Sequence, residues 1–154
     1  MIASASIPLV EIFLYFENKI IRASTNFIAR VDASNGVYNT HLYTNEARTN
    51  KSYTYNPDAN GNFVPLNANA FNNAIEADYS WVFFTLSAPS FYEKKNIYIN
   101  GMFNNYAISD ENKMDYNQEK GIYEKAIMIK QGFTNYQYVV ADQNKKIDYE
   151  NAID

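Results

Sequence analysis

The chain has 154 residues, a net charge of −4 and only 19% charged residues. Nucleic acids and anionic membrane surfaces bind clustered Lys and Arg, so neither is expected as a partner. The absence of cysteine excludes disulfides and thiolate metal sites. No apolar run is long enough to cross a bilayer as a helix, so direct membrane insertion is not expected either.

Aromatic residues are unusually abundant, at 16% of the chain, with 14 Tyr, 10 Phe and one Trp. Aromatic side chains favour the half-buried surfaces of strands, whereas the frequent Asn residues favour tight turns. No stretch shows the capped, amphipathic pattern of a helix. The sequence therefore predicts an all-β chain.

Short apolar or alternating runs, punctuated by Asn, Gly and Pro, predict strands along the whole chain. The clearest hairpin signal is Asn35-Gly36, because this dipeptide suits a turn with positive φ at both central residues. The polar segment 110–120 is expected to be a loop. The expected strands are 13–16, 20–23, 37–44, 52–55, 79–86, 97–99, 122–130 and 135–141.

The segment 79–86 is expected to be the best-buried strand, yet large apolar side chains occupy both of its faces. Either Trp81 and Phe83 or their alternate-face neighbours point into the core, and the sequence leaves this choice open. The remaining expected core residues are Ile97, Ile99, Phe103, Tyr123, Ile127, Ile129, Tyr136, Tyr138 and Val140.

A boundary is expected near Pro89, which breaks the strand pattern. Residues 1–88 are expected to form a β-rich unit that is incomplete. Residues 89–154 are expected to form an immunoglobulin-like β-sandwich, since turns recur there at the spacing of such folds. The chain ends at residues 151–154 without a closing strand, so we expect this unit to be truncated at its C-terminal edge.

Patterns that carry catalysis or metal binding are weak. His41 is the only histidine, and it is expected to be structural because no catalytic partner can be placed beside it. Glu76 and Asp78 could form a glycosidase pair, although nothing indicates their burial. The turn 56–61 resembles half a calcium loop but lacks the closing acidic residue. We therefore expect no catalytic residue, cofactor or metal, and no enzymatic activity.

The C-terminal half carries the motifs IYINGMFNNY (97–106), GIYE (121–124) and KQGFTNYQYVVAD (130–142). These resemble the early-set, immunoglobulin-like modules that bind glycogen and starch, although Gln137 replaces a lysine of that pattern. Within the turn, Gly101 is expected to permit the backbone reversal and Phe103 to fill the core. The expected ligand or partner contacts are Phe103, Asn104, Asn105 and Tyr106, the last in place of a stacking Trp.

A second set of motifs covers nearly the whole chain. In order, these motifs are FLYFENKIIRAS (13–24), LYTNEAR (42–48), YTYNPDANGNF (53–63), LNAN (66–69), IEADY (75–79), NGMFNNYAI (100–108) and KQGFTNYQYVVAD (130–142). Together they resemble the C-terminal half of the plug proteins of the type IX secretion system of Bacteroidetes. The resemblance implies a periplasmic protein, associated with the outer membrane, whose signal peptide lies outside this sequence.

Three functions follow as hypotheses. The first is a non-catalytic plug that docks on the outer-membrane translocon of the type IX system and seals its pore while no substrate is present. The alternative is a carbohydrate-binding module that uses Tyr106. The third is a glycosidase fragment that uses Glu76 or Asp78.

Overall fold

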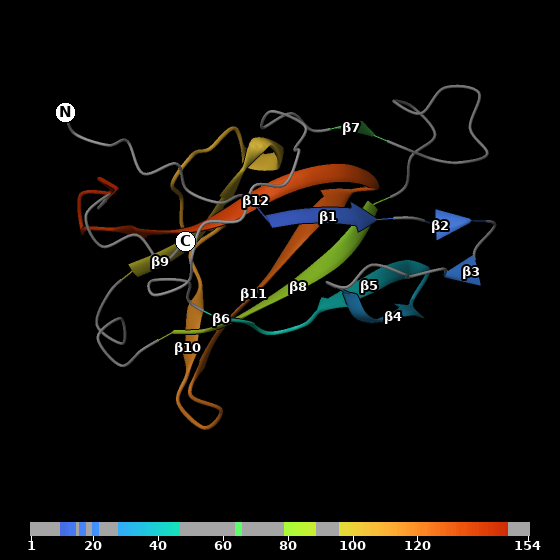
Figure 1. Cartoon of the computed structure of the whole chain (residues 1–154), viewed down its shortest axis with the longest axis horizontal. Coiled ribbons are helices and arrows are strands. Elements are labelled where there is room, and N and C mark those ends of the chain that lie inside the picture. The colour runs from blue at the N-terminus through green and yellow to red at the C-terminus, as the bar shows by residue number, and fades with distance from the viewer. Residues whose placement is uncertain are drawn as a thin grey trace.

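A computed structural model describes residues 10–14, 16–17, 20–21, 28–46, 64–65, 79–88 and 96–147 of the chain (Figure 1). These residues form strands and one short 3-10 helix, so the prediction of an all-β chain is confirmed. Within the described residues, no helix is long and apolar enough to span a membrane. The elements are β1 (Val10–Leu14), β2 (Phe16–Glu17), β3 (Ile20–Ile21), β4 (Ile28–Ser34), β5 (Val37–Leu42), β6 (Asn45–Glu46), β7 (Val64–Pro65), β8 (Tyr79–Ser87), β9 (Asn96–Gly101), η2 (Met102–Asn104), β10 (Asp115–Asn117), β11 (Ile122–Lys130) and β12 (Gly132–Ala141).

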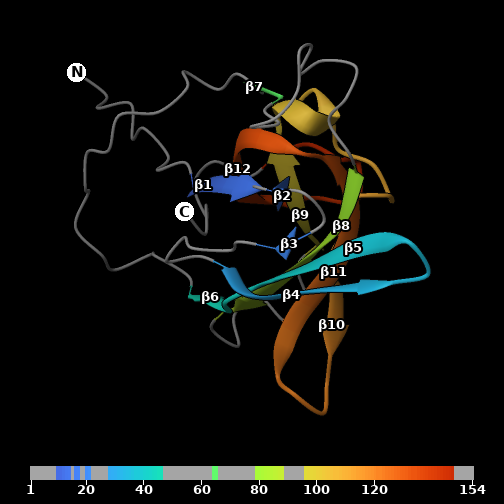
Figure 2. The same cartoon turned by 90° about the vertical axis from the view of Figure 1, so that its right-hand side faces the viewer.

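The larger sheet has six strands in the order β10-β11-β8-β5-β4, with β6 also paired to β8. Its pairings are antiparallel except along one edge of β8, where β5 and then β6 run parallel to it. Viewed from the side, β8 and β11 lie at the middle of this sheet, and the β10–β11 hairpin projects away from the body (Figure 2).

The expected hairpin at Asn35-Gly36 is present and joins β4 to β5. Asn35 has φ 52° and Gly36 has φ 77°, which is the left-handed backbone that a two-residue turn between antiparallel strands requires. Asn tolerates this conformation better than other side chains, and Gly adopts it without strain. The dipeptide therefore sets the register that places residues 30–34 opposite residues 37–41.

The second sheet is built on β12, which pairs with β1, β7 and β9. Only Gln131 separates β12 from β11, although the two strands belong to different sheets. Gly132, at φ 151°, begins β12 three residues before the expected start at Asn135. A glycine at this corner lets the chain pass from one sheet to the other without a loop.

The core lies between the two sheets and decides which face of β8 is inward. Val82, Phe84 and Leu86 are fully buried, whereas Trp81 is 39% exposed. The expectation that Trp81 could belong to the core is therefore wrong. Strand alternation allows only one face of β8 to meet the second sheet, and the side with the aliphatic Val82 and Leu86 meets it.

Most of the other expected core residues are buried. Phe103 and Ile127 are only half-buried and pack against the edge of the core. Among the described residues, the main core cluster is Ile28, Leu42, Val82, Phe84, Leu86, Ile97, Ile99, Met114, Tyr123, Ile129, Tyr136, Tyr138 and Val140.

Strands from both sides of the expected boundary near Pro89 share this core. β8 pairs with β11 over eight residues, from Tyr79 opposite Lys130 to Leu86 opposite Tyr123. The hydroxyls of Tyr136 and Tyr138 both donate to Oδ1 of Asn45, at 2.9 Å each. The described strands of 1–88 and 89–154 therefore meet in one sandwich, whose immunoglobulin-like connectivity stays a prediction.

Candidate functional site

The outer face of the larger sheet, which points away from the core, carries the candidate site. Alternation along each strand and the register between strands arrange its side chains in transverse rungs. One rung joins Asn39 of β5, Trp81 of β8 and Met128 of β11. The next joins Arg30 of β4, His41 of β5, Phe83 of β8 and Ala126 of β11.

Three exposed apolar side chains gather at one end of this face. Tyr79 is 56% exposed, and Trp81 and Met128 are each 39% exposed. Trp81 and Met128 are direct cross-strand partners, while Lys130 extends beside the Tyr79 ring with Nζ 5.8 Å from its centroid. We name Tyr79, Trp81 and Met128 the aromatic row. Its large side chains stand on two central strands, which fixes their positions.

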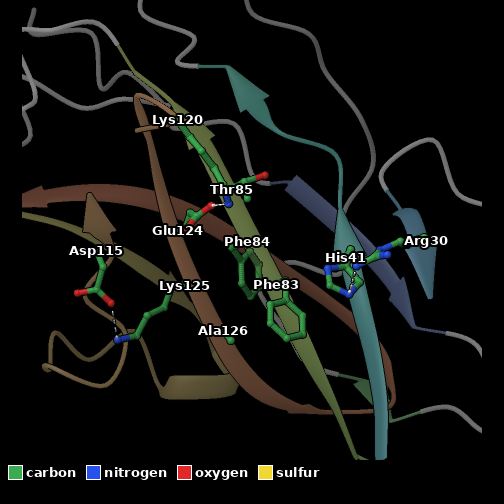
Figure 3. Close-up of a pocket in the computed structure, with 10 residues that line it drawn as sticks. All are labelled: Arg30, His41, Phe83, Phe84, Thr85, Asp115, Lys120, Glu124, Lys125 and Ala126. Atoms are coloured by element: carbon green, nitrogen blue, oxygen red, sulfur yellow. Dashed lines mark hydrogen bonds and ion pairs between the residues drawn. The ribbon is translucent and has the colours of Figure 1, made fainter. Parts of the chain in front are cut away.

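A shallow groove of about 620 Å³ lies beside the aromatic row, and we name it the slot. Its floor is the rung of Phe83 and Ala126, where the alanine methyl leaves the space that Met128 fills one rung away. Figure 3 shows the lining side chains, which come from five strands and the turn between β10 and β11. They are Arg30, His41, Phe83, Phe84, Thr85, Asp115, Lys120, Glu124, Lys125 and Ala126.

His41 forms one wall of the slot. Its ring stacks on Phe83, with centroids 4.4 Å apart and planes 12° from parallel. Its Nε2 lies 3.2 Å from Oδ2 of Asp32 and 3.3 Å from a guanidinium nitrogen of Arg30. Because Nε2 lies between Asp32 and Arg30 while one ring face stacks on Phe83, His41 is held in place and covers one face of the Phe83 ring.

The charged side chains around the slot form ion pairs with one another. Lys120 Nζ lies 2.6 Å from Glu124 Oε1, and Lys125 Nζ lies 3.7 Å from Asp115 Oδ2. On the opposite wall, a guanidinium nitrogen of Arg30 lies 3.8 Å from Asp32 Oδ2. Each cation thus has a carboxylate beside it, and these pairs present a polar surface with little net charge.

Two carboxylates of this face have lowered pKa values. Hydrogen bonds from Lys120 and then from Asn117 stabilise the ionised form of Glu124 and lower its pKa. The Asn39 amide is the main cause of the lowered pKa of Asp32, with help from His41 and Arg30. Both carboxylates are therefore ionised at neutral pH.

These shifts predict a small dependence of stability on pH. A carboxylate whose folded-state pKa is lowered stabilises the fold above its ordinary pKa, and this contribution is lost as the pH falls through the folded-state value. The free energy of unfolding in urea at pH 7 should therefore be higher for the parent chain than for Glu124→Gln, and this difference should shrink as the pH falls below the ordinary range of a glutamate carboxyl. A difference that stays unchanged while the carboxyl is titrated with acid would contradict this assignment.

The expected contact residues lie elsewhere, on η2 and the turn that follows it. Asn104 holds this turn, because its Oδ1 accepts from the Gly101 amide and its Nδ2 donates to the Ile99 carbonyl. Gly101 does not make the reversal, since its backbone is extended, with φ −177°. Asn105 and Tyr106, at φ 52° and 54°, make it instead.

The structure does not bring this turn to the slot. Phe103 packs against the core, and Tyr106 is 37% exposed. Both views place η2 beside β12 and β9, on the side of the sandwich away from the β10–β11 hairpin (Figures 1 and 2). The molecule therefore offers two separate surfaces, the turn and the outer face of the larger sheet.

The other candidates from the sequence are not placed by the structure. Glu76, Asp78 and the turn 56–61 lie outside the described residues. No group of three or more His, Asp or Glu side chains that could hold a metal ion occurs within the described part of the chain. The slot was not predicted from the sequence. Alternation assigns His41 to one face of the expected strand 37–44 and Phe83 to one face of the expected strand 79–86, but it does not pair the two strands.

The comparisons with known proteins show the fold and give no function. No family model and no curated protein matches the chain. Among solved structures, the chain is similar to the crystal structure of a hypothetical protein from Parabacteroides merdae ATCC 43184, with a TM-score of 0.80 and 29% identity. The match covers 94% of this chain and 35% of that protein, so the chain spans about a third of its length.

Proposed function

We propose that this protein is a non-catalytic plug of the type IX secretion system. It docks on the periplasmic side of the outer-membrane translocon and seals the pore while no substrate is present. The proposal rests on the motifs between residues 13 and 142, which occur in the order found in that family. The periplasmic location and the translocon partner belong to the same proposal.

The aromatic row supports a docking role. Trp, Tyr and Met are enriched at the centres of protein interfaces, where a few buried anchors supply most of the binding energy. Trp81 and Met128 stand side by side on β8 and β11, which are paired over eight residues. Because these strands are held in the middle of the sheet, the anchors lose little freedom on binding. The aromatic row is therefore the docking surface we assign to the plug.

Co-purification with the translocon tests this function. The full-length protein should be retained by an affinity-tagged translocon, and Trp81→Ala together with Met128→Ala should weaken binding at least about 10-fold, since each anchor contributes roughly 1–2 kcal/mol. Tyr43→Ala is a matched control, because Tyr43 is 57% exposed, like Tyr79, but lies outside the row. Failure of the parent protein to co-purify would contradict the plug.

A further inference from the structure

We propose that the slot binds a neutral oligosaccharide. This site is distinct from the aromatic row and from the Tyr106 turn, and it does not depend on the plug function. Three features carry the inference: an aromatic ring face that opens into the slot, charged groups that neutralise one another, and a floor whose backbone is already hydrogen-bonded.

The first feature is the open face of Phe83. His41, on β5, covers one face of the phenyl ring. The opposite side of Phe83 meets β11 at its cross-strand partner Ala126, and Figure 3 shows Phe83 between His41 and Ala126. Because Ala126 carries only a methyl group, it covers little of the ring, and the half-buried Phe83 lines the slot. The C–H face of a pyranose packs well against such a surface.

The second feature is the charge of the walls. Lys120 is paired with Glu124 and Lys125 with Asp115, while Arg30 and His41 share Asp32 on the other wall. A phosphate, a nucleotide or a charged peptide would have to break one of these pairs to gain a partner. Sugar hydroxyls both donate and accept, so a neutral saccharide can bind the paired groups as they are.

The third feature excludes strand addition. The slot lies on the face of β5, β8 and β11, whose backbone groups are used in the ladders between these strands. An extended peptide binds a sheet mainly through backbone hydrogen bonds at an open edge. A ligand of the slot must instead be recognised by side chains. The Thr85 hydroxyl, which donates to Thr44, leaves its oxygen as a further acceptor at the floor.

The volume also fits. About 620 Å³ lies within the range of small-molecule sites and suits a few sugar rings better than a single one. The open shape lets a longer chain continue beyond the groove. We therefore expect recognition of a short stretch within an oligosaccharide.

Intrinsic fluorescence gives a direct test, because Trp81 is the only tryptophan and lies one rung from the slot. Maltohexaose, cellohexaose, laminarihexaose and chitohexaose are titrated separately into the protein. At least one should give a saturable change in fluorescence with a dissociation constant on the order of 10⁻⁴ M, confirmed by calorimetry.

Ala126→Met, which fills the slot as Met128 fills the adjacent rung, should weaken that binding about 10-fold or more. Ala126→Ser keeps the space and should bind as the parent does.

Thermal unfolding of both variants controls for folding, and translocon binding by Ala126→Met should remain unchanged. The proposal is overturned if none of the four sugars shows binding at a concentration about 5-fold above the expected dissociation constant. It is also overturned if Ala126→Met binds as tightly as Ala126→Ser, or if only Tyr106→Ala removes binding. A hexagalacturonate and a neutral decapeptide of Ala and Thr are titrated in the same way. If either binds more tightly than the four neutral sugars, and Ala126→Met abolishes that binding, the slot takes another ligand and the proposal is wrong.

Discussion

Replacing Phe84 with alanine is expected to lower the free energy of unfolding by about 3–5 kcal/mol. Phe84 is fully buried at the centre of β8, and its ring meets Tyr136 of the second sheet edge-on, with centroids 4.9 Å apart. Truncation removes this contact and leaves a cavity between the two sheets, which the hydrogen-bonded strands cannot close. Urea denaturation followed by far-UV circular dichroism measures the loss.

Phe83→Ala is the matched control for Phe84→Ala. It removes the same side chain from the next residue of the same strand, but from the outer face, where Phe83 is only half-buried. We expect a loss of about 1–2 kcal/mol, because the site can fill with water. Equal losses from the two substitutions would contradict the orientation of β8.

The second large effect is expected at Asn45. Asn45→Ala removes the Oδ1 acceptor that the hydroxyls of Tyr136 and Tyr138 share. Both tyrosines are fully buried in the second sheet, whereas Asn45 lies on β6 of the larger sheet. Loss of hydrogen bonds to buried groups costs about 1–3 kcal/mol for each group affected, so we expect a total of about 2–4 kcal/mol by urea denaturation.

A double-mutant cycle separates this hydrogen bond from general packing. Tyr138→Phe should destabilise the parent chain by about 1 kcal/mol and should cost less in the Asn45→Ala background. The two residues lie far apart in the sequence, and the fold brings them together in this hydrogen bond. Strict additivity of the two substitutions would show that the contact contributes nothing to stability.

Local patterns in the sequence predict much of the fold. The turn residues Asn35-Gly36 identify the β4–β5 hairpin, because their backbone preference is local. The expected strand 122–130 matches β11 in full. The orientation of β8 could not be predicted, because Trp81 and Phe83 are as apolar as Val82 and Phe84. A strand whose outer face also carries large apolar side chains loses the alternation that identifies its inner face.

The slot could not be predicted from the sequence either. It depends on the register between β5 and β8, which places His41 beside Phe83, and no local signal encodes a pairing between strands so far apart. The motif around Tyr106 drew attention instead, because its residues are contiguous. In the structure, the Asn104 side chain and the backbone of Asn105 and Tyr106 build that turn, whereas the Tyr106 side chain is exposed.

The parallel pairing of β5 with β8 has a consequence for folding kinetics. Thr40 and Ser80, 40 residues apart, meet there through a buried 2.9 Å hydrogen bond between their hydroxyls. Bringing these two residues together closes a long loop, which costs chain entropy before their contacts can stabilise the sheet. The β4–β5 hairpin forms between neighbouring segments of the chain and closes only a short loop. We therefore expect β4 and β5 to join the sheet late. Because the outer face is complete only after that step, its ability to bind would report that the chain has finished folding.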